Sequence, residues 1–167
     1  IGMIKGNNTT LTATVTPPNT DEEVTWETSS STTVSVVRNS SNHKQATITA
    51  NNVGTATITV RSGSQSASVT VTVTNPATSV TISGSEEITV HRGTNQDVTA
   101  TKVPTDADDA ITWTSSDTSV ATVTVQSETN GVSTARINAL AKGDATITAS
   151  SGTATDTITV HVDAPIT

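Results

Sequence analysis

The stretch Ala141-Lys-Gly-Asp-Ala-Thr-Ile-Thr-Ala149 decides the fold class of this chain. Its residues Ala145, Ile147 and Ala149 alternate with threonine, so one face of an extended segment is apolar and the other is polar. A period of two is typical of a half-buried antiparallel β-strand, and the β-branched threonine suits the wetter face of such a strand. The pattern therefore predicts a sheet that packs one face against a core.

The same alternation recurs in most of the chain, which has 39 threonines and 20 valines among 167 residues. No segment has the periodicity of a helix. Turn residues separate the alternating runs at intervals of roughly 8–12 residues, which is the spacing typical of a β-sandwich. We therefore predict an all-β protein whose domains have about seven short strands each.

The alternating stretch belongs to a repeat. Gly54-Thr-Ala-Thr-Ile-Thr59 lies 89 positions before Gly143-Asp-Ala-Thr-Ile-Thr148, and Leu11-Thr-Ala-Thr-Val-Thr-Pro17 lies 87 positions before Val98-Thr-Ala-Thr-Lys-Val-Pro104. A repeat of this length suits a domain that folds by itself, whereas solenoid units are shorter. The chain is therefore predicted to be two tandem immunoglobulin-like β-sandwich modules.

Proline marks the boundary between the modules. Pro76 has no backbone N–H to donate, so it ends the last strand of the first repeat. We predict module one at residues 1–74, a linker at residues 75–78 and module two at residues 79–163. Residues 164–167 then begin a further linker or a tail.

The first strand of module one is missing from the repeat. Ile1-Gly-Met-Ile-Lys-Gly6 aligns with Ile88-Thr-Val-His-Arg-Gly93, so nothing in module one corresponds to the strand expected around Val80 to Ile82. The chain is then a piece of a longer array, a module that does without this strand, or a processed product. If the strand is absent, an open sheet edge could accept one from a neighbouring subunit.

Each module has a single tryptophan. Trp26 and Trp113 occupy the third-strand position, where an immunoglobulin-like sandwich buries its tryptophan. Val24 and Ile111 precede them by two residues, which places each ring on the apolar face of its strand. We interpret both tryptophans as structural core residues, with stacking on a glycan as the alternative.

Two segments of module two carry a resemblance to a known family. Ile111-Thr-Trp-Thr-Ser-Ser-Asp-Thr-Ser-Val-Ala-Thr-Val123 and the stretch at residues 141–149, with Pro104 before them, resemble the bacterial immunoglobulin-like group 2 domain. Module one is similar but looser, because Trp26-Glu-Thr-Ser-Ser has one extra residue before Val34. The resemblance implies an extracellular or virion-surface setting and no shared catalytic residues.

The charge distribution excludes one class of partner. The net charge is −7 and no basic cluster is present, so we expect no binding to nucleic acid. The charge belongs to module two, where four basic and eleven acidic residues give 4 − 11 = −7, while module one balances four against four. This asymmetry predicts that module two makes contacts of its own. No run of ten apolar residues occurs, so we expect no membrane insertion.

The histidines give little support for a metal site. His43 lies in a polar loop and is interpreted as solvated. His91 and His161 would face outward near each other if the first and last strands of module two lie side by side. Because no third ligand has suitable spacing, we predict no metal site there.

Acidic loops precede both tryptophan strands. Asp21-Glu-Glu23 and Asp106-Ala-Asp-Asp109 supply the oxygen ligands that calcium prefers, but neither has the Asp-x-Asp-x-Asp-Gly spacing that wraps an ion. We predict no cofactor and keep calcium as the alternative. Lys102 replaces Val15 at an inward position, which predicts a bulge that turns Val103 inward or a lysine whose amine reaches the rim.

The chain shows no nucleophile elbow, phosphate-binding glycine loop or pair of catalytic carboxylates, so we predict that it is not an enzyme. The favoured function is a rigid extracellular spacer and adhesion array that makes weak multivalent contacts with a cell-surface polysaccharide or protein receptor. One alternative is a bacteriophage capsid-decoration or tail protein that docks on neighbouring subunits. The other is an accessory module of a glycan-active enzyme.

Overall fold

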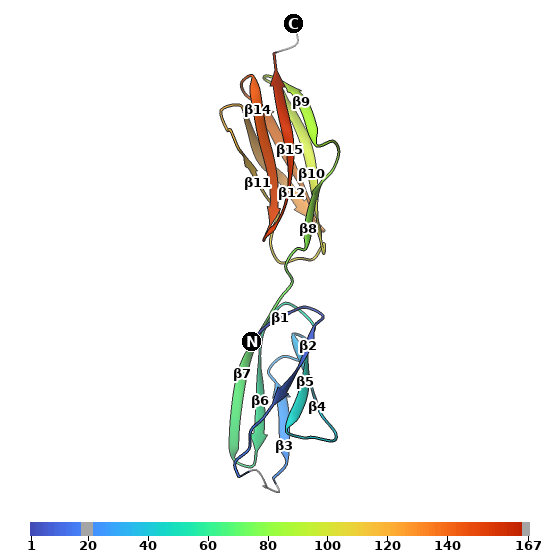
Figure 1. Ribbon diagram of the computed structural model, residues 1–167, viewed down its shortest axis with the longest axis vertical. Coiled ribbons are helices and arrows are strands. Elements are labelled where there is room, and N and C mark those ends of the chain that lie inside the picture. The colour runs from blue at the N-terminus through green and yellow to red at the C-terminus, as the bar shows by residue number, and fades with distance from the viewer. Residues whose placement is uncertain (18–21, 165–167) are drawn as a thin grey trace. The chain divides into compact units, whose positions relative to one another are not determined.

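The computed structural model describes residues 1–17 and 22–164. The chain divides into two compact units, Ile1–Asn75 and Pro76–Thr167, and the division falls inside the predicted linker. We use module one and module two for these units, which are coloured blue to green and green to red in Figure 1. The described residues form strands, turns and loops and no helix, so the prediction of an all-β protein is confirmed.

Module one is a sandwich of two sheets. Its strands are β1 (Gly2–Ile4), β2 (Asn8–Thr12), β3 (Val24–Thr28), β4 (Val34–Arg38), β5 (Gln45–Ala50), β6 (Gly54–Ser62) and β7 (Gln65–Thr74). One sheet has the order β1-β7-β6-β3 and the other has the order β2-β5-β4. Short turns join β6 to β7, and the loop after β2 includes the residues that the structure does not describe.

Module two repeats this plan with one more strand. Its strands are β8 (Ser79–Ile82), β9 (Glu87–His91), β10 (Asn95–Val103), β11 (Thr112–Ser115), β12 (Ala121–Thr129), β13 (Val132–Ala139), β14 (Gly143–Ser151) and β15 (Ala154–Asp163). The sheets have the orders β11-β14-β15-β9 and β12-β13-β10-β8. The described parts therefore contain seven strands in module one and eight in module two, close to the predicted seven each.

Parallel pairing at the sheet edges confirms which strands correspond. β1 runs parallel to β7 with Met3 opposite Val73, and β9 runs parallel to β15 with Val90 opposite Val162. The remaining paired strands are antiparallel. The extra strand β8 pairs with β10 and has no counterpart in the described part of module one, where β2 lies at the sheet edge.

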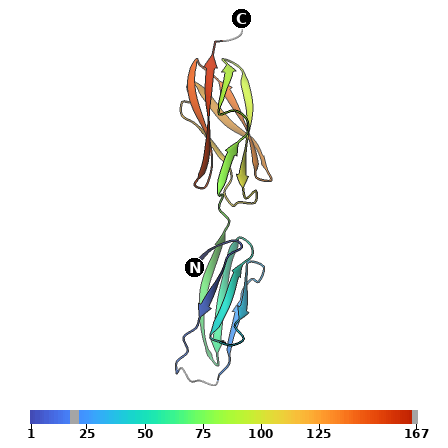
Figure 2. The ribbon, with the colours of Figure 1, turned by 45° about the vertical axis from the view of Figure 1, so that its right-hand side comes forward.

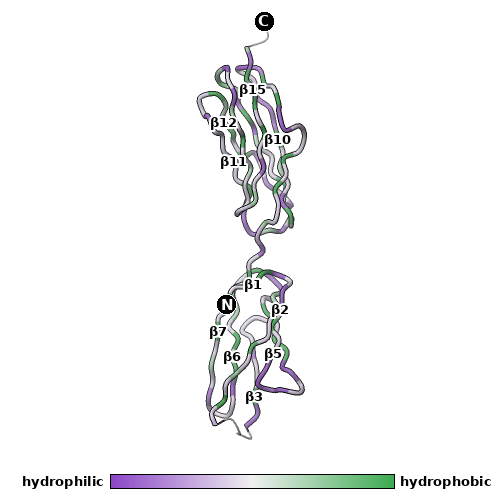
Figure 3. The backbone as a smooth tube through the Cα atoms, viewed as in Figure 1, coloured by the Kyte–Doolittle hydropathy of each residue, from purple (hydrophilic) through white to green (hydrophobic). Residues whose placement is uncertain are grey.

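Alternation along the strands builds one core in each module. Ile58 in β6 and Ile147 in β14 are buried at corresponding positions, while neighbouring threonines point away from the core. Figure 3 shows how hydrophobic residues recur along the strands of both modules. With aliphatic side chains of modest size and a single aromatic ring, each core depends on two sheets that cover each other closely.

The two tryptophans lie on the inward faces of β3 and β11 but differ in burial. Trp113 is 9% exposed, and its indole Nε1 donates a hydrogen bond to the buried Ser133 Oγ at 3.0 Å. Trp26 packs against the core of module one but is only partly buried, and its Nε1 donates to the backbone oxygen of His43 at 3.0 Å. The core of module two is thus closed around its ring, whereas the ring in module one stays accessible.

One predicted strand is shorter than its pattern indicates. The alternation of Leu11, Ala13 and Val15 predicts a strand through Val15, but β2 ends at Thr12. The corresponding strand β10 continues to Val103 because β8 pairs with residues 100–103 on its outer side, as Figures 1 and 2 show. A segment at a sheet edge loses its strand geometry where no neighbour supplies hydrogen bonds, so the prediction was wrong for residues 13–15.

The difference in burial predicts unequal effects of the same truncation. Trp113→Ala is expected to lower the free energy of unfolding of module two by about 3–5 kcal/mol, because it leaves a cavity and an unpaired Ser133 hydroxyl. Trp26→Ala should cost module one less, since part of the ring is already exposed. Differential scanning calorimetry of the whole chain would measure both transitions, with the exposed Leu140→Ala as the control. Equal losses for the two tryptophans would contradict this prediction.

Candidate functional site

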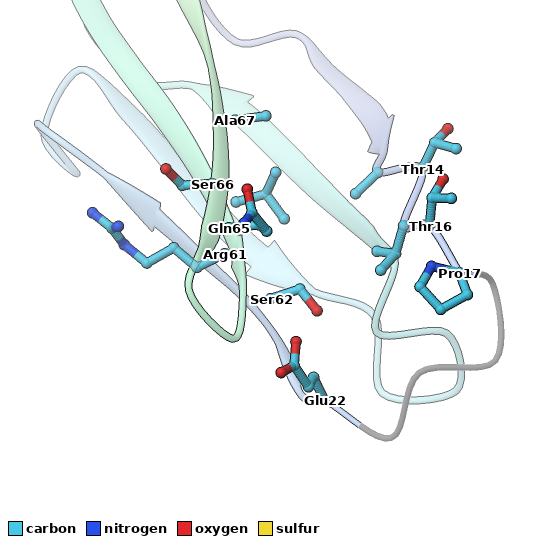
Figure 4. A pocket seen from close by; sticks show the side chains of 12 residues that line it. Thr14, Thr16, Pro17, Glu22, Arg61, Ser62, Gln65, Ser66 and Ala67 are labelled. Atoms are coloured by element: carbon cyan, nitrogen blue, oxygen red, sulfur yellow. The ribbon is translucent and has the colours of Figure 1, made fainter.

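A groove opens on module one between its two sheets. Two adjoining cavities of about 370 and 310 Å³ lie between residues 11–17 on one side and β6 and β7 on the other, and both are lined by Ala13, Thr14, Val60 and Ala67. Figure 4 shows the deeper end, where Thr16 and Pro17 face the turn between β6 and β7. We call this feature the seam groove, because it follows the line where the two sheets meet.

The walls of the seam groove are mainly apolar near the core and mixed at the far end, where Glu22, Arg61 and Gln65 line the larger cavity. Leu11, Trp26 and Val69 line the part near the core, and Arg61 at the far end is bonded to Glu27 by an ion pair of 3.6 Å between Nε and Oε2. Ser62 Oγ is buried and has no hydrogen-bond partner among the described residues. This lining offers apolar contact and backbone hydrogen-bonding groups rather than acids and bases arranged for catalysis.

Module two has a buried ion pair at the position that corresponds to the far end of the groove. Lys102 is 5% exposed, and its Nζ donates to the backbone oxygen of Asp109 at 2.6 Å and to Glu128 Oε1 at 3.0 Å. Glu128 Oε2 accepts a hydrogen bond from the Ile111 N–H at 2.9 Å. The expectation that Val103 turns inward was wrong, because Val103 is 52% exposed. The Lys102 amine instead reaches the loop residue Asp109 and the side chain of Glu128 beside an open depression.

The outward histidines of module two are paired with carboxylates. His161 Nδ1 donates to Asp144 Oδ1 at 2.8 Å, and its Nε2 lies 3.8 Å from Glu87 Oε2. The hydrogen bond to Asp144 raises the pKa of His161 above its ordinary value, and the negative charges of Asp144 and Glu87 add to this effect. Desolvation of the ring lowers the pKa but does not cancel the rise. His91 Nδ1 is hydrogen-bonded to Asp163, so contacts between histidines and carboxylates join β9, β14 and β15 on their outer face.

The structure places the acidic loops apart from any set of metal ligands. Asp21 lies outside the described residues, and Glu23 forms an ion pair with Arg38, whose hydrogen bond and charge lower the pKa of Glu23. Asp106 and Asp108 line an open depression beside Lys102. Within residues 1–17 and 22–164, no group of three or more histidine or acidic side chains is arranged to hold a metal ion.

The remaining histidine, His43, lies in the loop before β5 and lines a shallow hollow beside Glu22 and Glu23. Its backbone oxygen accepts the hydrogen bond from the Trp26 indole N–H. In the parts of the chain that the structure describes, no helix is long and apolar enough to cross a membrane.

Sequence reasoning missed the two features that distinguish the modules most. The seam groove depends on contacts between segments far apart in the chain, although the unmatched strand at Val80 to Ile82 did indicate an open edge. The pairing of Lys102 with Glu128 left a weaker signal, namely a lysine at an inward position of an alternating strand. Such a residue needs a buried partner, and the partner comes from another strand.

The fold and the repeat define a class of protein, a tandem array of immunoglobulin-like β-sandwiches. Residues 3–73 and 76–162 match the family described as bacterial Ig-like domain (group 2). The two matches cover most of the chain, which therefore belongs to this family. The resemblance of residues 111–123 and 141–149 to the family is thereby confirmed, and module one belongs to it as well.

A relative of known activity contains a similar segment. The chain is 38% identical over 97 residues to lacto-N-biosidase of Bifidobacterium bifidum, and this similarity covers 54% of the chain and 8% of the relative. The chain thus corresponds to a small part of that protein.

Solved structures show the same sandwich in surface proteins. Domains 1–6 of surface layer protein SbsC are 25% identical to the chain, with a TM-score of 0.51 over 87% of the chain and 20% of that structure. The adhesin InvE of Yersinia pseudotuberculosis is 14% identical, with a TM-score of 0.54 over 97% of the chain and 56% of that structure, which is a likeness of fold alone. The family and the surface layer protein are domain types without catalytic function.

The ion pair in module two predicts that substitutions of its two partners lower the free energy of unfolding by different amounts. Glu128→Gln is expected to cost module two about 3 kcal/mol, because it leaves the Lys102 amine buried without a counter-charge. Lys102→Met should cost less, since Glu128 is 23% exposed and keeps its hydrogen bond from Ile111. Urea unfolding of the whole chain would measure both losses. A larger loss for Lys102→Met than for Glu128→Gln would contradict this account.

The raised pKa of His161 predicts a pH dependence with a definite sign. Because the folded-state pKa exceeds the unfolded one, the protonated imidazole stabilises module two below the unfolded pKa, and this stabilisation is lost as pH rises through the folded-state pKa. The melting temperature of the parent chain should therefore exceed that of Asp144→Asn by more at about pH 5.5 than at about pH 8.5. In the matched His161→Gln background, the effect of Asp144→Asn on the melting temperature should not depend on pH. A gap that stays constant with pH in the parent chain would refute the assignment.

Proposed function

We propose that the chain is a non-catalytic structural segment of an extracellular surface protein, which holds other parts of that protein away from the cell. The observation that carries this proposal is the pair of family modules, similar over 87% of the chain to domains of a surface layer protein. A sandwich with aliphatic cores and threonine on its outer faces presents a polar, inert surface, as a spacer requires.

The spacer role requires a stiff connection between the modules. The longest strands, β7 and β15, have ten residues each, so a module extends about 34 Å at about 3.4 Å per residue, and two modules end to end would extend about 70 Å. Pro76 lies in the connection, and its fixed φ angle limits the conformations open to the linker. Weak contact of the polar faces with a polysaccharide or protein receptor would add avidity when many modules act together.

Small-angle X-ray scattering tests the spacer proposal. The chain should give a maximum dimension of about 70 Å or more, and insertion of Gly-Gly-Ser-Gly-Gly-Ser between Asn75 and Pro76 should broaden the distance distribution, because glycine-rich linkers are flexible. The same insertion in the exposed loop at Ser40 is the control. If the parent chain and the linker variant scatter alike, the connection is already flexible and the spacer proposal is wrong.

A second function has specific support from the similarity to lacto-N-biosidase at 38% identity. In that proposal the modules accompany a glycan-active catalytic domain elsewhere in the polypeptide and bind carbohydrate weakly. Affinity electrophoresis in gels that contain soluble polysaccharides would reveal such binding as slower migration, and Trp26→Ala would test whether the partly buried ring takes part. The bacteriophage alternative stays a prediction that no observation favours.

A further inference from the structure

The strand β12 is an outer edge of one sheet of module two. It has nine residues and pairs on one side with β13, in the order β12-β13-β10-β8. An edge strand presents backbone N–H and C=O groups that can pair with a strand of another chain. The turn that joins β12 to β13 is fixed, because the Lys102 N–H donates to the Gly131 oxygen at 2.9 Å. The edge is therefore long and well ordered.

The beginning of β12 is already covered, and the middle is exposed. Ser115 Oγ of β11 donates to the Ala121 oxygen at 2.7 Å, and the Ala121 N–H donates to the Asp117 oxygen at 3.0 Å. Residues 124–127 are exposed, and the aliphatic Val125 among them has an exposed fraction of 51%. The part of this edge that another strand could reach is thus the stretch around Val125.

An extra residue interrupts this exposed stretch. Val125 pairs with Ala135 and Ser127 pairs with Thr134, so the register skips Gln126. Two residues of β12 then oppose one residue of β13, which is a β-bulge, and a bulge bends and twists its strand. The Gln126 side chain also folds back on its own strand, where Nε2 donates to the backbone oxygen of residue 124 at 3.3 Å. The spacing of backbone groups along the edge is therefore irregular at Gln126.

The buried ion pair of module two does not require this extra residue. Glu128 lies opposite Ser133 on the inward face, where it contacts Lys102. Since residues 125 and 127 already pair with neighbouring residues of β13, a strand without Gln126 would keep Glu128 on the same face. The extra residue therefore changes the outer edge of β12 and leaves its inward contacts as a regular strand would have them.

Module one has a different feature at the corresponding place. Its edge strand β4 has five residues, which pair one to one with residues 46–50 of β5. β4 ends at Arg38 opposite Ala46, and Ala46 corresponds to Ala135 at the offset of 89. Short length, charged side chains and bulges are alternative ways in which edge strands avoid pairing. The charged end of β4 thus corresponds to Val125, where the bulge of β12 begins.

We propose that Gln126 is an inserted residue whose bulge keeps the β12 edge of module two from pairing with the same edge of a second copy of this chain. Residues 121–127 are uncharged, so two copies of this edge would not repel each other. An edge that meets its own copy antiparallel about a twofold axis makes each contact twice. This inference concerns how copies stay separate and goes beyond the spacer function.

Deletion of Gln126 from the whole chain tests the proposal. The deletion makes the pairing between β12 and β13 regular and keeps Glu128 beside Lys102, so module two should still fold. In sedimentation velocity, the average mass of the deletion variant should rise toward about twice that of the monomer as the concentration increases, whereas the parent chain should stay monomeric.

Two further variants and one measurement locate the contact. Gln126→Ala keeps the extra residue and its bulge, so it should stay monomeric. The deletion combined with Ser127→Lys should also stay monomeric, because a lysine on the exposed face of an edge strand opposes pairing. Amide hydrogen exchange of the deletion variant should be slower at high than at low concentration within residues 121–129, and unchanged in β4.

Several results would overturn the inference. It fails if the deletion variant stays monomeric, if Gln126→Ala associates as strongly as the deletion, or if the added lysine leaves the association intact. It also fails if the slowed exchange lies outside β12, or if the indole N–H resonance of Trp113 shows that the deletion unfolds module two, since the extra residue would then serve the fold itself. None of these results bears on the spacer proposal, whose test is the scattering of the parent chain.

Discussion

Backbone pairing between β8 and β10 is the constraint on which the rest of module two depends. A sandwich with aliphatic cores has few large side chains to fill gaps, so it closes only where a strand covers the line between its sheets. In module two β8 supplies both the hydrogen bonds and the side chains Val80 and Ile82. The burial of Trp113 and the length of β10 depend on that single strand.

The sequence predicted the features that repeat and missed those that depend on tertiary contact. Alternation and the offset of nearly 90 residues were enough for the strands and the two modules, because both signals are local or periodic. The family followed from the resemblance of residues 111–123 and 141–149. The end of β2 at Thr12 was mispredicted, since alternation describes one strand and says nothing of its neighbour. The partner of Lys102 was also missed, because Glu128 lies on a different strand and no spacing rule connects them.

For the candidate site residues, too, the sequence predicted the face of each strand but not the tertiary contacts. The sequence placed both tryptophans on inward faces, but their different burial depends on whether a strand lies over them. His91 and His161 were expected to face outward near each other, and they do lie on the outer face of the neighbouring strands β9 and β15. Each also has a carboxylate partner there, which the sequence did not predict. Three acidic residues of module two, Glu87, Asp144 and Asp163, thus have a histidine partner within the module.

The parallel pairing of terminal strands has a mechanical consequence. In each module the last strand runs parallel beside an early strand, β7 beside β1 in module one and β15 beside β9 in module two. Tension between the ends of either pair pulls the two strands in opposite directions along their length. The hydrogen bonds between them are then loaded together in shear, whereas a hairpin pulled at its open end would lose them one after another. Each parallel pair therefore resists being pulled apart along the length of its strands.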